Sequence, residues 1–303
     1  MSQIPTPESR PLVGVSWMLL AGLSFVIMTA IVKHVGSDLP AAQSAFLRFL
    51  TGLVFFIPMA RSLTRVRLSR LSWRLLALRG VVHTLGVICW FYAMARIPVA
   101  EVTAMNYLNP VYVTLGAALF MGEKISVRRI SAIGMALVGV LIILRPGFRE
   151  ISTGHLAMLV TAVMLAASYL CAKVASREAG PGTVVAILSV SVTIGLAPFA
   201  ALVWVTPTWG QLAWLFLVAG FATAGHYFMT RAFRAAPMAV IQPVTFLQLV
   251  WATLLGWVVF GEGVDGWVIL GGSVILGSVS YITWRETRLK RRAVTPAANA
   301  TKL

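Results

Sequence analysis

Long apolar runs follow one another along the whole chain, separated by short polar joints that are rich in proline and glycine. A run of about 20 apolar residues can cross the hydrocarbon core of a bilayer as a helix. The runs and their breaks predict ten such helices, at 11–34, 41–60, 73–95, 100–121, 126–145, 154–175, 182–205, 210–233, 238–260 and 265–285. The pattern therefore predicts an all-α integral membrane protein with ten transmembrane helices.

The composition excludes a water-soluble enzyme. Of 303 residues, 59% are hydrophobic and only 11% are charged, and the mean hydropathy is +0.87. Soluble domains have about 25% charged residues and cannot hide this much apolar surface in a core of this size. The ten predicted helices use almost the whole chain, so no stretch remains for a globular domain outside the membrane.

The positive charge indicates topology rather than a nucleic-acid partner. The net charge is +16, which in a soluble protein would suggest nucleic acid. In a membrane protein, however, Lys and Arg gather in the short cytoplasmic loops. With the N-terminus inside, most of the 25 Lys and Arg residues fall on the inner side, and the few on the outer side are Lys33, Arg96, Arg145 and Arg149. We therefore expect a bacterial inner (plasma) membrane protein with both termini in the cytoplasm and no nucleic-acid partner.

The two halves of the chain are weakly repeated. Pro98, Gly122 and Glu123 in the first half have the same spacing as Pro237, Gly261 and Glu262 in the second. The repeat unit has five predicted helices, an odd number, so the two halves must have opposite orientations in the membrane. Inverted repeats that flank a site near the membrane midplane are a recurring architecture of transporters; the alternative is a duplication kept only for packing.

The repeat and the charged ends divide the chain into four segments. These are a cytoplasmic N-terminal tail at 1–10, a first five-helix repeat at 11–147, a second at 153–285, and a basic cytoplasmic tail at 286–303. Helices 126–145 and 265–285 have small residues at a spacing of four, Ala132 and Ala136 in one and Ser273 and Gly277 in the other. This spacing predicts a close seam between the two helices.

The sequence resembles the drug/metabolite transporter superfamily, in its EamA-type branch. The resemblance covers about 14–285 and rests on the ten helices, the Arg48-Phe49 pair, the Pro98 and Pro237 joints, and the Gly-Glu pairs after 100–121 and 238–260. It implies two inverted five-helix repeats and a carrier of amino acids, metabolites, nucleotide-like cofactors or riboflavin. The run Trp90-Phe91-Tyr92 is similar to that of carriers of S-adenosylmethionine.

Arg48 is interpreted as the only basic residue well inside a predicted helix. A charge at that depth is costly and normally faces a cavity or a partner. Its guanidinium can attract a carboxylate or phosphate of a substrate. The alternative is a structural arginine that donates to backbone carbonyls or extends toward the membrane surface.

Polar and aromatic side chains near the middle of the helices are the other candidates for a substrate pocket. Helices 100–121 and 238–260 have polar centres at equivalent positions of the repeat, and polar groups at membrane depth need partners; the alternative is that they join helices. Aromatic rings nearby favour a flat or apolar substrate if they line the pocket. Together with Arg48, the candidate substrate-binding residues are Trp90, Tyr92, Asn106, Tyr107, Asn109, His226, Tyr227, Gln242, Thr245 and Gln248.

No catalytic constellation, metal-ligand cluster or phosphate-binding glycine loop is evident in the sequence, and no cofactor or metal is expected. All nine acidic residues fall near predicted helix ends or in loops and tails, so the candidates for a proton site are His83 and His226. A membrane enzyme acting on lipid would need buried acid–base or metal residues, which this pattern lacks.

The sequence therefore predicts a secondary transporter that works by alternating access on a small organic molecule within the lipid bilayer. Export of an amino acid or a related metabolite is expected first. The alternative is uptake of an aromatic or nucleotide-like cofactor, either riboflavin or S-adenosylmethionine. The direction of transport, the coupling ion and the formation of a homodimer are left open.

Overall fold

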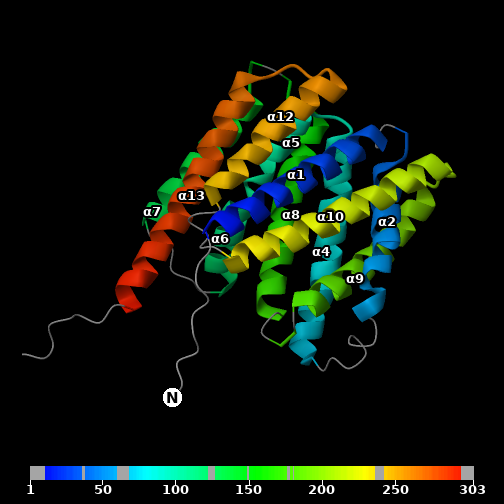
Figure 1. The fold of residues 1–303 in the computed structure, drawn as a ribbon, viewed down its shortest axis with the longest axis horizontal. Helices are drawn as coiled ribbons and strands as arrows, with labels where there is room; N and C mark the ends of the chain where they lie inside the picture. The colour runs from blue at the N-terminus through cyan, green and yellow to red at the C-terminus, as the bar shows by residue number, and fades with distance from the viewer. Residues whose placement is uncertain are drawn as a thin grey trace, which may run out of the picture.

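A computed structural model of the chain describes residues 11–35, 38–59, 68–121, 127–148, 150–175, 178–179, 181–235 and 242–294. Within these ranges every regular element is a helix (Figure 1). In chain order they are α1 (Pro11–Val35), α2 (Ala41–Gly52), the 3-10 helix η1 (Leu53–Met59), α4 (Arg70–Met94), α5 (Val99–Asn106), α6 (Asn109–Met121), α7 (Val127–Leu144), α8 (Thr153–Ala175), α9 (Pro181–Leu202), α10 (Trp209–Ala235), the 3-10 helix η2 (Gln242–Thr245), α12 (Phe246–Phe260) and α13 (Gly266–Val294).

The predicted all-helical fold is confirmed, with differences at four places. The helix expected at 41–60 ends as α2 at Gly52 and continues as the 3-10 helix η1, which contains Pro58. The helix expected at 100–121 is broken at Tyr107 and Leu108 into α5 and α6, just before Pro110, whose ring has no N–H to donate to the preceding turn. The described part of 238–260 begins as η2, which contains Pro243, before α12. The last helix, α13, continues past 285 to Val294, into the segment expected to be a tail; a basic C-terminal end is favourable for a helix.

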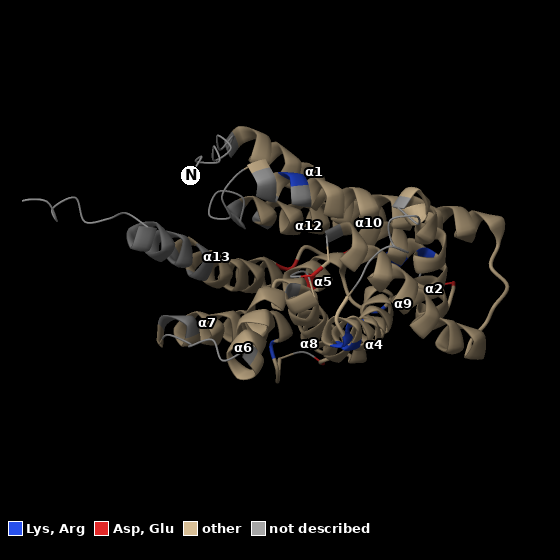
Figure 2. Cartoon of the chain, turned by 90° about the horizontal axis from the view of Figure 1, so that it is seen from below, with Lys and Arg blue, Asp and Glu red and all other residues tan. Residues whose placement is uncertain are grey.

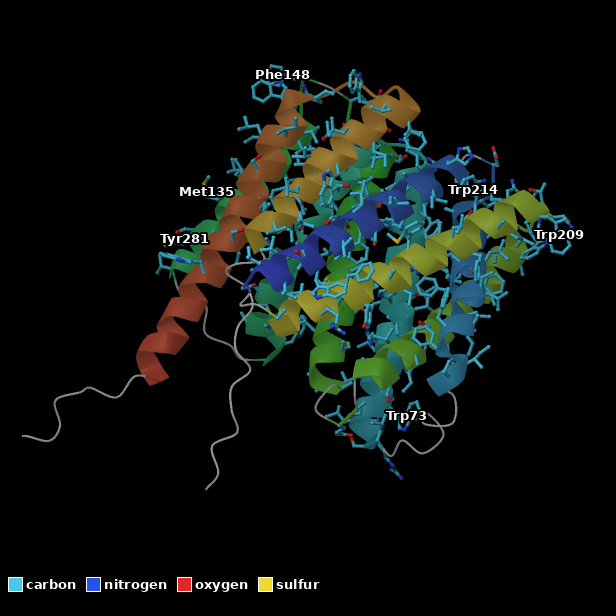
Figure 3. The ribbon with its side chains drawn as sticks, in the orientation of Figure 1. Trp73, Met135, Phe148, Trp209, Trp214 and Tyr281 are labelled. Carbon is cyan, nitrogen blue, oxygen red and sulfur yellow. The ribbon has the colours of Figure 1, made fainter. Side chains whose placement is uncertain are left out.

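The outer surface of the bundle is apolar. Six of the described helices are long and apolar enough to cross a membrane, and three shorter apolar helices accompany them. Large hydrophobic side chains project from the periphery, such as Trp209 and Phe148, which are 87% and 92% exposed (Figure 3). So much exposed apolar surface is unstable in water but is what a lipid-facing surface requires.

The packing of the helices follows the repeat. In Figures 1 and 2, α1, α10 and α12 form one layer across α4 and α8, while α7 with α13 and α2 with α9 lie at opposite edges. The repeat makes α1 equivalent to α8 and α4 equivalent to α10, so exchanging the two halves turns the packed pair α1–α10 into the packed pair α8–α4. In the pairs α2–α9 and α7–α13, each helix packs against its own equivalent in the other half. The two halves are therefore interleaved around an approximate two-fold relation, as an inverted repeat requires.

The seam between α7 and α13 is formed by glycine, but not at the predicted positions. A Cβ atom on Gly139 would lie 2.7 Å from the carbonyl oxygen of Gly271, and one on Gly271 would lie 2.5 Å from that of Gly139. A Cβ atom on Gly277, in contrast, would have no described atom of another segment within 4 Å. The small-residue spacing predicted the correct pair of helices, but the closest approach lies at Gly139 and Gly271, which were not predicted, and the predicted Gly277 has no described neighbour there.

The two ends of the bundle are named here after a residue in each. The Pro98 end holds the C-termini of α1 and α4 and the N-termini of α5 and α8; the Ser69 end holds the N-terminus of α4 and the joint between α8 and α9. At the Pro98 end, Gln43 of α2, which is fully buried, accepts from the backbone N–H of Val205 at 2.8 Å and donates to its carbonyl oxygen at 2.5 Å. This pairing fixes the start of α2 against the segment that follows α9.

The N-terminus of α4 is capped at the Ser69 end. The Ser69 side chain accepts from the backbone N–H of Ser72, and the carboxylate of Glu178 accepts from both the backbone N–H and the hydroxyl of Ser69, at 2.8 Å each. These two donors hold the pKa of the Glu178 carboxyl below its usual range. The contact joins the first half of the chain to the second.

Acidification should weaken this contact. Because the pKa of Glu178 is lower in the folded protein than in the unfolded chain, its stabilising effect is complete above the unfolded pKa and is lost as the pH falls through the lowered value. We expect E178Q to lower the melting temperature of the detergent-solubilised protein slightly at neutral pH, with the difference from wild type closing in acid. Parallel melting temperatures of the two proteins at every pH would contradict this.

Candidate functional site

Two arginines and two histidines approach one another from three helices near the centre of the bundle. Arg48 is in α2, Arg79 and His83 are one turn apart in α4, and His226 is in α10. His83 shares the hydroxyl of Ser168 with Arg79 and a ring contact, that of Phe49, with Arg48, and His226 is close enough to interact electrostatically with both arginines. We call these four residues the basic centre.

Ser168 of α8 joins two members of the basic centre. Arg79 is 5% exposed; its Nη1–H donates to the carbonyl oxygen of Val184 in α9 at 2.8 Å, and its Nε lies 3.4 Å from the Ser168 hydroxyl. The Nδ1 atom of His83 lies 3.0 Å from the same hydroxyl. Arg79 is thus held by hydrogen bonds to both α8 and α9, which leaves the guanidinium of Arg48 as the more available one.

Aromatic rings accompany the basic centre. The guanidinium of Arg48 lies 4.1 Å from the ring centroid of Phe49, and this ring meets His83 edge-on at 6.2 Å. The ring of Phe25 in α1 meets His226 edge-on at 5.1 Å. His226 still has an exposed surface, and Arg48 and His83 are partly exposed. These three side chains belong to helices that pack on one another and yet remain accessible, as is expected of residues that line a space open to water.

Arg79 corrects the interpretation of Arg48 as the only basic residue well inside a predicted helix. Because α4 begins at Arg70, Arg79 lies about 14 Å along the helix axis, at 1.5 Å per residue. Arg48 is therefore not the only basic residue well inside a helix. An arginine four residues before a histidine on one helix face was the available signal.

The polar centres predicted in helices 100–121 and 238–260 meet where α5 gives way to α6 and η2 to α12. The hydroxyl of Tyr107, at the break between α5 and α6, donates to the carbonyl oxygen of Thr245 in η2 at 2.9 Å. Asn109 has a buried side-chain oxygen without a hydrogen-bond partner in the described part of the chain. Asn106 and Gln248 are half-buried, and Gln248 lies against Gly22 of α1. The side chain of Gln242 lies outside what the structure describes.

Three aromatic candidates have contacts elsewhere. The hydroxyl of Tyr92 lies 3.0 Å from that of Thr153 at the Pro98 end, nine residues and about 14 Å along α4 from His83. Trp90 packs against the main apolar core and meets Phe91 edge-on. Tyr227 is 53% exposed and accepts from Arg231 of the next turn. Their role in binding remains a prediction.

The charge of the basic centre decides what it can bind. Each acidic residue whose side chain the structure describes lies in a joint or in the first turn of a helix: Asp38, Glu101, Glu150, Glu178, Glu262 and Asp265 (Figure 2). The centre is therefore positive and rich in hydrogen-bond donors, which suits an anionic group or a ring with several acceptor atoms. In the described ranges no three His, Cys, Asp or Glu residues lie together as metal ligands.

A sequence model of the EamA-like transporter family matches the chain twice, at residues 12–145 and 152–284. The chain belongs to this family. It is therefore a multi-pass membrane protein of ten helices in two inverted repeats, and it transports a small molecule rather than catalysing a reaction.

Curated relatives of this EamA-family protein transport different metabolites. The riboflavin transporter of Rhizobium johnstonii is 33% identical over 298 residues, which cover 96% of this chain and 97% of the relative. The pseudopaline exporter of Pseudomonas aeruginosa strain UCBPP-PA14 is 30% identical over 269 residues, 87% and 93% of the two chains. The S-adenosylmethionine uptake transporter of Rickettsia bellii is 22% identical over 282 residues, 93% and 97%.

A crystal structure supports the fold independently. A solved chain with 21% sequence identity superposes with a TM-score of 0.59 and covers 91% of this protein and 99% of its own length. At this identity the likeness concerns the fold alone. The family membership and the relatives establish a transporter of a small metabolite.

Proposed function

We propose that this EamA-family protein takes up riboflavin or a closely similar flat, acceptor-rich metabolite by alternating access at the basic centre. The observation that carries the proposal is the approach of Arg48, Arg79, His83 and His226 beside the rings of Phe25 and Phe49. The 33% identity to a riboflavin transporter over almost the whole chain supports it.

The chemistry of the flavin ring matches that of the basic centre. An isoalloxazine is planar and has carbonyl oxygens and ring nitrogens that accept hydrogen bonds along one edge. Arg48 and the two histidines can donate to that edge, and guanidinium and aromatic rings can stack on its face. S-adenosylmethionine is less suitable, because its sulfonium charge would be repelled by a centre with two arginines.

Export of a metabolite with carboxylate groups is the second candidate. Two arginines at membrane depth are also an attractive site for carboxylates, and the pseudopaline exporter shows 30% identity over most of the chain. This candidate corresponds to the amino-acid-type export that the sequence favoured. It ranks second here because both the aromatic rings of the centre and the relative with 33% identity favour a flavin.

The arrangement of contacts supports a state closed at the Pro98 end. There, an ion pair joins Lys33 to Glu262 at 2.5 Å and another joins Arg145 to Asp265, and both pairs connect the two halves of the chain. With both termini in the cytoplasm of a bacterial cell, as the distribution of Lys and Arg favours, the Pro98 end faces outward. The state described is then closed to the outside.

Uptake by cells gives a direct test. In a bacterial strain that cannot synthesise riboflavin, the full chain should restore growth at low external riboflavin and raise uptake of labelled riboflavin several-fold. An empty vector is the control for background entry. Absent riboflavin uptake, together with raised tolerance to amino acids or to carboxylate metallophores and faster efflux, would replace this proposal with the second candidate.

A further inference from the structure

A buried carboxylate–imidazole pair lies at the Pro98 end, apart from the basic centre. The Oε2 atom of Glu101 lies 2.5 Å from the Nε2 atom of His155, and the two residues are 3% and 4% exposed. Glu101 is in the first turn of α5 and His155 in the first turn of α8, so the pair joins the first half of the chain to the second. Titratable residues buried in a membrane protein mark ion or proton pathways unless another role accounts for them.

The contacts of the imidazole fix its protonation. The backbone N–H of Ser152 donates to Nδ1 of His155 at 3.1 Å, and the Ser152 hydroxyl lies 2.9 Å from the same atom. Because a backbone N–H can only donate, Nδ1 holds a lone pair and the ring's single proton is on Nε2, where it is donated to Glu101. The pair then has a net charge of −1, and one further proton makes it neutral.

The pair is located where the two halves must separate if the Pro98 end is to open. The carbonyl oxygen of Ile97, just before α5, accepts from Lys33 at 3.0 Å, and the backbone N–H of Val99 donates to Glu262 at 3.0 Å. A Cβ atom on Gly154 would lie 2.8 Å from the side chain of Ile97, so the start of α8 sits directly on this joint. Separation of α5 from α8 would break the Glu101–His155 contact and expose both groups to water.

Other charged groups lie at the Pro98 end. In the described part of the chain these are Lys33 and His34 of α1, Asp38 before α2, Arg96 after α4, Arg145 after α7, Glu150 before α8, Glu262 after α12 and Asp265 before α13. Lys33 pairs with Glu262 and Arg145 with Asp265. His34 is exposed and meets Trp214 of α10 edge-on. Of the three pairs at this end, Glu101–His155 is the most deeply buried, and it combines a carboxylate with an imidazole, the side chain that most often serves as a proton carrier.

We propose that Glu101 and His155 form the proton-binding site that couples transport to the pH gradient. One proton binds from the outer solution while the Pro98 end is open, is held in the pair when α5 and α8 close, and is released on the cytoplasmic side before the next opening. The proposal requires that the chain be a transporter, but not that riboflavin be its substrate.

Measurements on the purified full-length protein in liposomes distinguish proton coupling from transport of the substrate. Two quantities are measured: riboflavin uptake with the outside acidic or at equal pH, and riboflavin counterflow, which needs no gradient. Wild type should show uptake several-fold faster with the outside acidic. E101Q and H155Q should lose this stimulation and keep counterflow, because glutamine preserves a hydrogen-bonding group without titrating. E150Q is the matched control: Glu150 is an exposed carboxylate of the same end, in the joint just before α8, and its stimulation should remain.

A second measurement does not depend on the substrate. The melting temperature of the detergent-solubilised wild type should change between acid and neutral pH, and E101Q and H155Q should lose most of that change while E150Q keeps it. Retained acid stimulation in E101Q and H155Q, or a wild type indifferent to the gradient, would overturn the proposal. If wild type carries no riboflavin at all, the proposed substrate fails, and the melting temperatures then decide the proton site by themselves.

Discussion

Replacing Arg48 by alanine should nearly abolish transport while leaving the protein in the membrane. The guanidinium of Arg48 lies against Phe49 near the middle of the bundle, and it is the arginine of the basic centre that is not already hydrogen-bonded to α8 and α9. A hydrogen bond from a charged donor contributes about 1.5–3 kcal/mol, which corresponds to a loss of about 10- to 100-fold in substrate uptake. R48K should be intermediate, because lysine keeps the charge and loses the planar donor group.

The measurement is the initial rate of labelled riboflavin uptake, divided by the amount of transporter in the membrane. R70Q is a suitable control, because Arg70 is exposed at the first residue of α4 and its loss changes the net charge by the same amount. R70Q should transport at the wild-type rate. Wild-type uptake by R48A would remove Arg48 from the substrate site and leave it the structural role that its sequence position also allowed.

Adding one methyl group at Gly139 or Gly271 should destabilise the fold more than any other change considered for the seam. A Cβ atom on either glycine would press against the backbone oxygen of the other, at 2.7 and 2.5 Å. Backbone atoms cannot rotate away as the end of a side chain can, so α7 and α13 must move apart. We expect G139A and G271A each to lower the free energy of unfolding by about 1–3 kcal/mol.

Two other glycines on the same helices are matched controls. A Cβ atom added to Gly134 of α7 or to Gly277 of α13 would have no described atom of another segment within 4 Å. G134A and G277A should therefore leave the melting temperature unchanged or raise it, because alanine favours a helix over glycine by up to about 1 kcal/mol. The check is the melting temperature of the four variants in detergent. Equal melting temperatures for G139A and G134A would show that the close contact of the two helices does not stabilise the protein.

The sequence predicted the fold because the membrane constrains it strongly. In a bilayer the backbone must satisfy its own hydrogen bonds, so apolar runs of sufficient length become helices. Their number and order, and the inverted relation of the halves, followed from the runs and from the shared spacing of Pro98, Gly122 and Glu123 with their counterparts. Of these residues, Pro98, Gly261 and Glu262 are described, and Glu262 pairs with Lys33 and accepts from the backbone N–H of Val99; Gly122, Glu123 and Pro237 lie outside the described residues.

The site was predicted only in part, because it depends on how helices are rotated and paired. The sequence indicated Arg48, His83 and His226 as separate candidates. It did not single out Arg79, although this residue is one turn before His83 in the same helix, because the sequence does not show that the two side chains meet the same serine of α8. It placed Glu101 near a helix end and overlooked His155, whose partner is distant in sequence and close only after α5 and α8 pack together.

The sequence by itself determined that this protein is a membrane-embedded bundle of two inverted five-helix repeats, because hydrophobic length and repeated joints are properties of consecutive residues. Only the tertiary structure decided which side chains act together. The basic centre, the glycine seam and the Glu101–His155 pair each combine residues from different helices. Their contacts depend on the rotation of each helix about its axis and on its neighbours, which the pattern of a single run does not specify.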